Sequence, residues 1–234
     1  MTNLLSHLLQ DVYHLFYPNL CLACEESLVA NEYLVCIDCW SQLPETLFHL
    51  QINNPMEQKL WGRVHFEYAT SMYYFNKDSR IQHLLHALKY KGQKEVGIML
   101  GKRFAKAIEK CVWIDDIDIL IPLPLSKKKK VQRGYNQSTQ IALGMEKVLA
   151  KPVVTYAIER VKNTATQTKM TRSERVQNVE GAFCVVDGQL LAGKHVLLID
   201  DVITTGATLE ACANTILKES SAKVSIATLA YAIE

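Results

Sequence analysis

The sequence lacks any apolar run of the roughly 20 residues that a membrane-spanning helix needs. It also lacks a basic start ahead of an apolar stretch, and Asp11 interrupts the first leucines, so we expect no secretory signal peptide. A large excess of one charge is missing as well. The net charge is only +2, which argues against a chain that binds nucleic acid over its whole surface. These absences predict a cytoplasmic protein with no membrane insertion.

The composition is that of a folded protein, with 49% apolar and 21% charged residues among 234. Nearly continuous apolar runs at 118–125 and 194–200 are typical of strands buried on both faces of a parallel sheet. The spacing of apolar residues predicts, in chain order, a helix at 3–17, a strand at 67–76, helices at 79–90, 94–111 and 136–149, a short strand at 153–155, a helix at 206–219 and a strand at 223–232. This alternation predicts an α/β fold with a doubly wound, mainly parallel sheet.

The run at 194–200 ends in an acid, Asp200, and a second acid, Asp201, follows it directly. In open α/β sheets this end of a strand is where ligands bind. The loop from Thr204 to Thr208 then opens a helix, where Gly206 lets the backbone approach an anion and free N–H groups favour phosphate. The acids can accept hydrogen bonds from ribose hydroxyls, directly or through Mg²⁺ and water. A strand end and a helix cap alone would not explain two acids, a glycine turn and three hydroxyls together.

A second candidate phosphate site is the segment after the run at 118–125, which we expect to be a loop. It carries Leu125, Ser126, Lys127, Lys128 and Arg133, and cations with backbone N–H groups at a strand end suit a pyrophosphate. A solvated basic loop is the alternative interpretation.

The polar stretch at 159–183 contains the cations Arg172 and Arg175. A long loop of this kind is typical of a lid that excludes water and adds positive charge beside a departing pyrophosphate. We therefore include both arginines among the candidate catalytic residues. An exposed helix with charged faces is the alternative for the part after Met170.

Two cysteine pairs, Cys21 with Cys24 and Cys36 with Cys39, have the spacing of a four-thiolate zinc site. Four thiolates leave no open position on Zn²⁺, so the expected role is structural, and metal binding would supply folding energy to this small segment. An iron–sulfur cluster is an alternative, and disulfides fit a reducing compartment less well. The other three cysteines have apolar neighbours and are predicted to be core residues.

At the acid pair and the loop that follows it, the chain resembles the type I phosphoribosyltransferases. The resemblance implies that Asp200 and Asp201 hold the ribose hydroxyls of 5-phosphoribosyl-1-pyrophosphate (PRPP), bound with Mg²⁺. It also implies that the 5-phosphate is cradled by Thr204, Thr205, Gly206, Ala207 and Thr208.

The combined motifs are similar to those of the ComF family, the competence-associated phosphoribosyltransferase-like proteins. The matching residues are the two cysteine pairs, Leu88–Gly92, Pro122–Ser126, Arg133–Gln137, Thr166–Gln167, Arg172–Arg175, Asn178 and the run from Val196 to Thr208. This resemblance implies three parts: an N-terminal helix and zinc-ribbon-like module at 1–45, a linker and hood at 46–117, and a phosphoribosyltransferase core at 118–234.

Two functions follow from the resemblance. The first is an enzyme that transfers phosphoribosyl from PRPP to an unidentified nitrogen acceptor and releases pyrophosphate. The alternative is a non-catalytic competence factor that binds single-stranded DNA or a helicase partner during DNA uptake. The sequence indicates neither the acceptor nor the oligomeric state.

Overall fold

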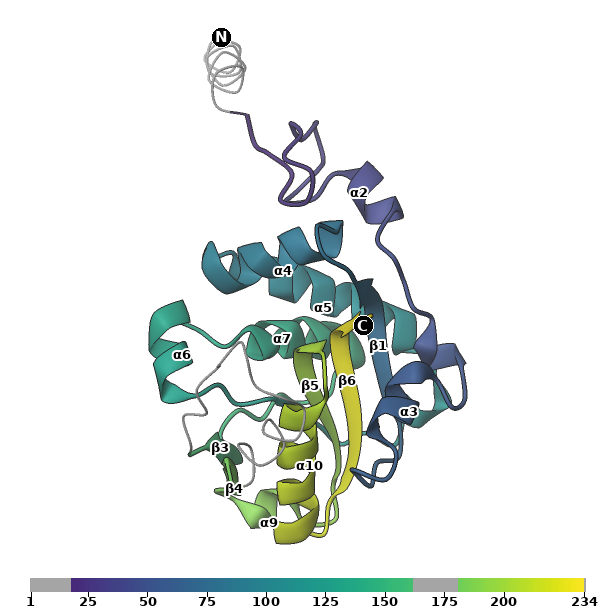
Figure 1. Ribbon diagram of the computed structural model, residues 1–234, viewed down its shortest axis with the longest axis vertical. Helices are drawn as coiled ribbons and strands as arrows, with labels where there is room; N and C mark the ends of the chain where they lie inside the picture. The colour runs from purple at the N-terminus through teal and green to yellow at the C-terminus, as the bar shows by residue number, and fades with distance from the viewer. Residues whose placement is uncertain (1–17, 162–180, 234) are drawn as a thin grey trace.

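The computed structural model of the protein describes residues 18–161 and 181–233. Its centre is a parallel sheet of four strands in the order β1–β6–β5–β2 (Figure 1). The strands are β1 (Ala69–Phe75), β2 (Ile119–Pro122), β5 (His195–Ile203) and β6 (Lys223–Ala232). Strand order and direction confirm the parallel α/β fold predicted from the sequence. The helix predicted at 3–17 lies outside the described residues.

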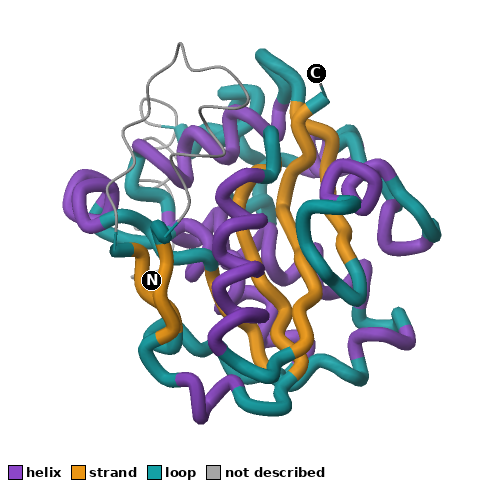
Figure 2. Tube along the Cα trace, turned by 60° about the horizontal axis from the view of Figure 1, so that its bottom comes forward, coloured by secondary structure: helices purple, strands orange, loops and turns teal. Residues whose placement is uncertain are grey.

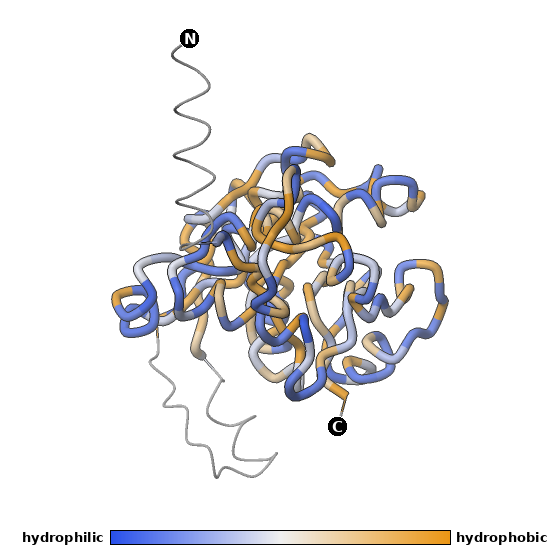
Figure 3. The backbone as a smooth tube through the Cα atoms, turned by 90° about the horizontal axis from the view of Figure 1, so that it is seen from above, coloured by the Kyte–Doolittle hydropathy of each residue, from blue (hydrophilic) through white to orange (hydrophobic). Residues whose placement is uncertain are grey.

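Helices cover both faces of this sheet, as Figure 2 shows. Leu197 and Ile199 of β5 pack on one face, against α4 (Arg80–Tyr90), α5 (Lys94–Ile108) and α7 (Gln137–Leu149). Val196 and Leu198 pack on the other face, against α3 (Pro55–Leu60), α9 (Gly188–Leu191) and α10 (Ala207–Glu219). Successive strand residues point to opposite faces, so a strand covered on both sides is apolar at most positions, as β5 is from Val196 to Ile199. Many apolar segments accordingly run through the middle of the molecule (Figure 3).

Helices α5 and α7 touch backbone to backbone. A Cβ atom at Gly101 of α5 would lie 2.1 Å from the carbonyl oxygen of Ile141, and one at Gly144 of α7 would lie 2.2 Å from that of Ile98. Only glycine permits this approach. The contact fixes α7, whose first turn carries Ser138 toward the end of β5.

Irregular segments bond to both edges of the sheet. Beside β1, the N–H of Thr46 donates to Met72 O at 2.9 Å, and the N–H of Tyr74 donates to Pro44 O at 2.8 Å. Beside β2, Leu120 exchanges backbone hydrogen bonds with residues 152 and 154, each of 2.9 Å. The short strand predicted at 153–155 is therefore a single bridge between Val153 and Leu120.

Two further elements differ from expectation. The segment expected as a loop after β2 forms helix α6 (Lys127–Arg133), because Ser126 caps its first turn and Gly134 ends it in a left-handed conformation. Strands β3 (Ile158–Arg160) and β4 (Phe183–Val185) form a small antiparallel pair beside the main sheet. The shorter elements are α2 (Ile37–Ser41), η1 (Phe48–Leu50) and η2 (Val112–Ile114). Across the described ranges, no helix has both the length and the apolar character needed to span a bilayer.

Candidate functional site

The acid pair lies within β5, near the carboxyl end of the sheet. One carboxylate oxygen of Asp200 accepts hydrogen bonds from Ser138 Oγ at 2.9 Å and from the N–H of Asp201 at 2.8 Å. Burial raises the pKa of Asp200 to about 7, and the neighbouring charge of Asp201 contributes to this shift. Asp200 is thus held by two hydrogen bonds, while burial favours its protonated form.

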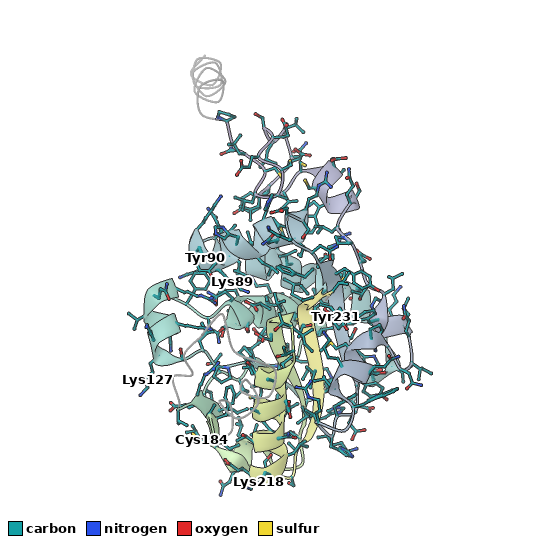
Figure 4. All side chains as sticks on the ribbon, viewed as in Figure 1. Lys89, Tyr90, Lys127, Cys184, Lys218 and Tyr231 are labelled. Atoms are coloured by element: carbon teal, nitrogen blue, oxygen red, sulfur yellow. The ribbon has the colours of Figure 1, made fainter. Side chains whose placement is uncertain are left out.

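Cations from three elements surround the acid pair. Lys89, at the end of α4, lies 2.8 Å from Asp201 (Nζ to Oδ2), and Figure 4 labels it beside Tyr90. Burial lowers the pKa of Lys129 on α6, and the charges of Arg160 and Arg133 lower it further, while Asp201 raises it. Burial likewise lowers the pKa of Arg160 on β3, against the opposing charge of Asp200. Positive and negative groups therefore share one desolvated region, which suits a ligand with both hydroxyls and phosphates.

The loop Thr204–Thr208 follows β5 and opens α10, as the sequence predicted. Gly206 occupies the position before the helix with φ of +78°, in the left-handed region. A Cβ atom there would approach Leu60 to 3.2 Å. The glycine is therefore required for the turn itself as well as for backbone access.

Two cations outside the predicted motifs orient this loop. Lys59 Nζ donates to Thr204 O at 2.9 Å, and Arg63 Nη1 donates to Thr205 O at 2.8 Å. In a trans peptide the N–H points opposite to the carbonyl. The N–H groups of Thr205 and Gly206 therefore point away from Lys59 and Arg63. Glu210 of α10 holds Arg63 in place at 3.0 Å (Oε2 to Nε).

The residues of the basic segment differ in their exposure and contacts. Lys127 and Lys128 are exposed, whereas Lys129 is half-buried near the acid pair. Lys127, which Figure 4 labels, nevertheless lines a cavity together with Leu125 and Arg160. Ser126 caps the helix and Arg133 donates to Gln137 Oε1 at 2.7 Å. The cavity that Leu125 and Arg160 line has a volume of about 510 Å³. Arg172 and Arg175 lie outside the described residues.

The two tyrosines nearest the site have different surroundings. Tyr135 is 8% exposed, and its hydroxyl donates to Leu88 O, so it packs between α7 and α4. Tyr90 is 60% exposed, with its ring 5.4 Å from the guanidinium of Arg133 and 4.9 Å from the ring of His86. Tyr90 therefore lies largely outside the core at the end of α4 and contacts the side chains beside it.

The four paired cysteines converge, as their spacing predicted. The sulfur atoms of Cys21, Cys24, Cys36 and Cys39 all lie within 4.8 Å of one another. Cys24 and Cys36 Sγ are 3.8 Å apart. Four bonds of about 2.3 Å to a tetrahedral Zn²⁺ would place sulfur atoms about 3.8 Å apart. The cluster can therefore bind a metal such as zinc.

The cysteine cluster is attached to the main domain through α4. Arg80 Nε donates to Cys39 Sγ at 3.3 Å, and His83 Nδ1 lies 2.7 Å from Ala23 O. The other cysteines lie elsewhere: Cys212 is fully buried on α10, while Cys111 and Cys184 are half-buried. The core role predicted for these three holds fully only for Cys212.

Several known proteins are similar to this chain in amino-acid sequence. Residues 132–234 match the phosphoribosyl transferase domain family. Competence protein F of Haemophilus influenzae is 26% identical over 204 residues, which cover 84% of this chain and 83% of that protein. Competence protein ComFC of Bacillus subtilis is 30% identical over 154 residues, which cover 65% of this chain and 59% of that protein. DNA utilization protein YhgH of Escherichia coli (strain K12) is 24% identical over 228 residues, covering 89% and 95%.

Solved structures give weaker matches. The glutamine PRPP amidotransferase of B. subtilis matches with a TM-score of 0.41 and 18% identity, covering 61% of this chain and 30% of that chain. A hypoxanthine phosphoribosyltransferase from Staphylococcus aureus matches with a TM-score of 0.37 and 15% identity, covering 59% and 64%. The chain thus spans about a third of the amidotransferase chain.

The part of the chain that supplies β5 and the loop after it is thus similar in sequence to phosphoribosyl transferase domains. Most of the chain is similar in sequence to the ComF and YhgH proteins, the family that its motifs resemble.

Replacing the buried acid should change the pH dependence of stability. Because the pKa of Asp200 is raised from 3.8 to about 7, ionisation destabilises the folded chain as pH rises through this window. We expect Asp200→Asn to raise the free energy of unfolding at about pH 8 by on the order of 4 kcal/mol, and by less than half of that near pH 5. Urea unfolding at both pH values, without ligand, measures this.

Asp118→Asn is the matched control with the opposite sign. Asp118 accepts the N–H of His195 at 2.8 Å, which holds the pKa of that carboxyl below its usual value. Its replacement should lower stability at the higher pH. Equal effects of Asp200→Asn at both pH values would contradict a raised pKa.

Proposed function

We propose that this protein binds PRPP with Mg²⁺ and transfers its phosphoribosyl group to a nitrogen acceptor, releasing pyrophosphate. The proposal depends mainly on one observation. The acid pair lies beside a loop in which the N–H groups of Thr205 and Gly206 point away from Lys59 and Arg63, the cations that bond to the loop. The sequence match to phosphoribosyl transferase domains supports it.

In this proposal each part of the site has a role. Asp200 and Asp201 accept hydrogen bonds from the ribose hydroxyls, and their carboxylates suit Mg²⁺, which prefers oxygen ligands. Residues 204–208 bind the 5-phosphate at the start of α10. Mg²⁺, when bound, supplies charge neutralisation on the pyrophosphate.

The cations of α6 and β3 bind the leaving pyrophosphate. Lys129 and Arg160 are desolvated beside the acid pair, so their charges act in a medium of low dielectric constant. As the bond from the ribose C1 to pyrophosphate breaks, charge accumulates on the pyrophosphate and these cations stabilise it. Holding the reactants in place supplies the remainder of the acceleration, without a protein nucleophile.

Adjacent lysines provide a matched test of this assignment. Lys129→Met should weaken PRPP binding about tenfold, because it removes a charge-assisted contact. Lys128→Met, one residue earlier and exposed, should leave binding unchanged within twofold or so. Calorimetric titration of PRPP with Mg²⁺ measures the affinity, and pyrophosphate release on adding candidate amines and nucleobases measures turnover. The proposed site is wrong if PRPP fails to bind, or if the two variants weaken binding equally.

For the cysteine cluster we propose a structural zinc ion. N–H groups of Ala23 and Cys36 donate to Cys21 Sγ at 3.5 and 3.3 Å, which favours the thiolate that a metal requires. With four sulfur ligands the metal has no open position for substrate, so its contribution is to the folding of the segment from residue 18 to residue 41.

Elemental analysis of the purified protein should give about one zinc per chain and no iron. Cys36→Ser should reduce bound zinc to less than about half, because three-sulfur sites bind weakly. Cys184→Ser, at a cysteine outside the cluster, should retain it. Stoichiometric iron would support the iron–sulfur alternative instead.

A second candidate function is binding of single-stranded DNA, which one surface groove favours. The groove, of about 630 Å³, lies between the cysteine-rich segment and the outer faces of α5 and α7. It presents the rings of Tyr33 and Trp40 beside the cations Lys102, Arg103, Lys106 and Lys147, over an apolar floor of Ile98, Met99 and Val148. Tyr33 is 65% exposed, and the Arg103 guanidinium lies 4.9 Å from the Trp40 ring centre. Stacking rings along a basic groove are typical of sequence-tolerant binding to single strands.

We expect a labelled oligothymidine to bind with an affinity that falls steeply as salt increases. Tyr33→Ala should weaken binding about tenfold through loss of a stacked base. Tyr156→Ala removes a similarly exposed tyrosine outside the groove and should have no effect. Fluorescence anisotropy at several salt concentrations measures both. Absence of binding at low salt would leave the transferase as the sole candidate.

A further inference from the structure

A second cavity, of about 390 Å³, lies beside the edge strand β1 and shares no residue with the acid pair or the loop after it. The lining includes residues 48–54, Glu57 and Trp61, the segment 66–68, and Trp113 of η2. Its floor is the start of β1, at Ala69 and Thr70. None of the functions considered above uses this cavity.

Two buried polar atoms with no hydrogen-bond partner among the described residues belong to residues that line the same cavity. They are Thr70 Oγ1, on a residue only 2% exposed, and His49 Nδ1. Buried polar groups in folded proteins almost always have partners, because an unmade hydrogen bond costs about 1–3 kcal/mol. Two such atoms in one cavity indicate a ligand with at least two polar atoms on one edge.

The walls of the cavity favour a flat ring. Tyr68 and Trp113 stack with ring centres 5.3 Å apart and an interplanar angle of 19°. Tyr68 is 38% exposed and Trp61 is 53% exposed, and both residues line this cavity. A planar heterocycle can stack on these rings while its edge bonds to Thr70 and His49.

The charges of the cavity disfavour a phosphate. Its lining contains the carboxylates of Glu57 and Glu67 and, among described residues, neither lysine nor arginine. Burial lowers the pKa of His49, so the imidazole is neutral at pH 7 and offers one donor and one acceptor. This is the opposite of the region around the acid pair, where cations gather from three elements.

We infer that this cavity binds a small, planar, uncharged heteroaromatic compound of nucleobase size, hydrogen-bonded by Thr70 and His49. Cavities of about 300 Å³ and above with mostly apolar walls and a few convergent polar groups are typical of such ligands. The assignment is independent of PRPP binding, since it depends on residues 48–70 and Trp113 alone.

Tryptophan fluorescence gives a local readout. Trp61 and Trp113 line the cavity, and Trp40, the third tryptophan, lies in the basic groove. Titrating Trp40→Phe protein with adenine, hypoxanthine, cytosine and uracil, with excess pyrophosphate present, should give saturable quenching with at least one base. Adenosine 5′-monophosphate should bind more weakly than adenine, because its phosphate would meet the carboxylates of the lining.

The Thr70→Val variant distinguishes an effect on base binding from an effect on protein stability. Valine has the shape of threonine, and the hydroxyl it removes has no partner, so the melting temperature should stay the same or rise. The affinity for the base should fall about tenfold. Thr70→Ser should restore it, and Thr215→Val, at a hydroxyl on α10 outside this cavity, should leave it unchanged.

Three results would overturn the inference. The first is no saturable quenching by any of the four bases. The second is equal binding to wild-type and Thr70→Val protein. The third is tighter binding of adenosine 5′-monophosphate than of adenine, which would place the nucleotide at the cations around the acid pair instead.

Discussion

Two neighbouring carboxylates lie in a strand that helices cover on both faces, and their negative charge must be balanced there. Lys89 at the end of α4 lies 2.8 Å from Asp201, and Ser138 at the start of α7 bonds to Asp200. Lys129 lies close enough for its pKa to respond to Asp201. Each contact comes from a separate element, so the acid pair acts as the point against which α4, α6 and α7 are positioned.

The sequence alone predicts the sheet, the acid pair and the cysteine cluster, because each depends on residues close together in the chain. It does not predict the cations that complete the site. Lys59 and Arg63 reach Thr204 and Thr205 across about 140 residues, and nothing in their local pattern indicates this contact. The lysine run is visible in the sequence. Which lysine is half-buried depends on α6 being a helix, and a helix is predicted here only if Ser126 is taken as its N-terminal cap.

Helix α4 connects two regions that the sequence presents as separate. Arg80 and His83 near its start bond to the cysteine-rich segment, and Lys89 near its end pairs with Asp201. Arg80 and Lys89 are nine positions apart in this helix, about 14 Å along its axis. Because a helix transmits displacement along its length, the position of the cysteine cluster and that of the cation at the acid pair are mechanically related.

The bonds at both sheet edges have a further consequence for assembly. Pro44 and Thr46 occupy backbone groups of β1, and residues 152 and 154 occupy those of Leu120 in β2. Strand addition, in which another chain extends a sheet through its free N–H and carbonyl groups, is therefore blocked at these positions. A macromolecule that binds there must use side-chain contacts, and the same obstruction protects these strands from edge-to-edge aggregation.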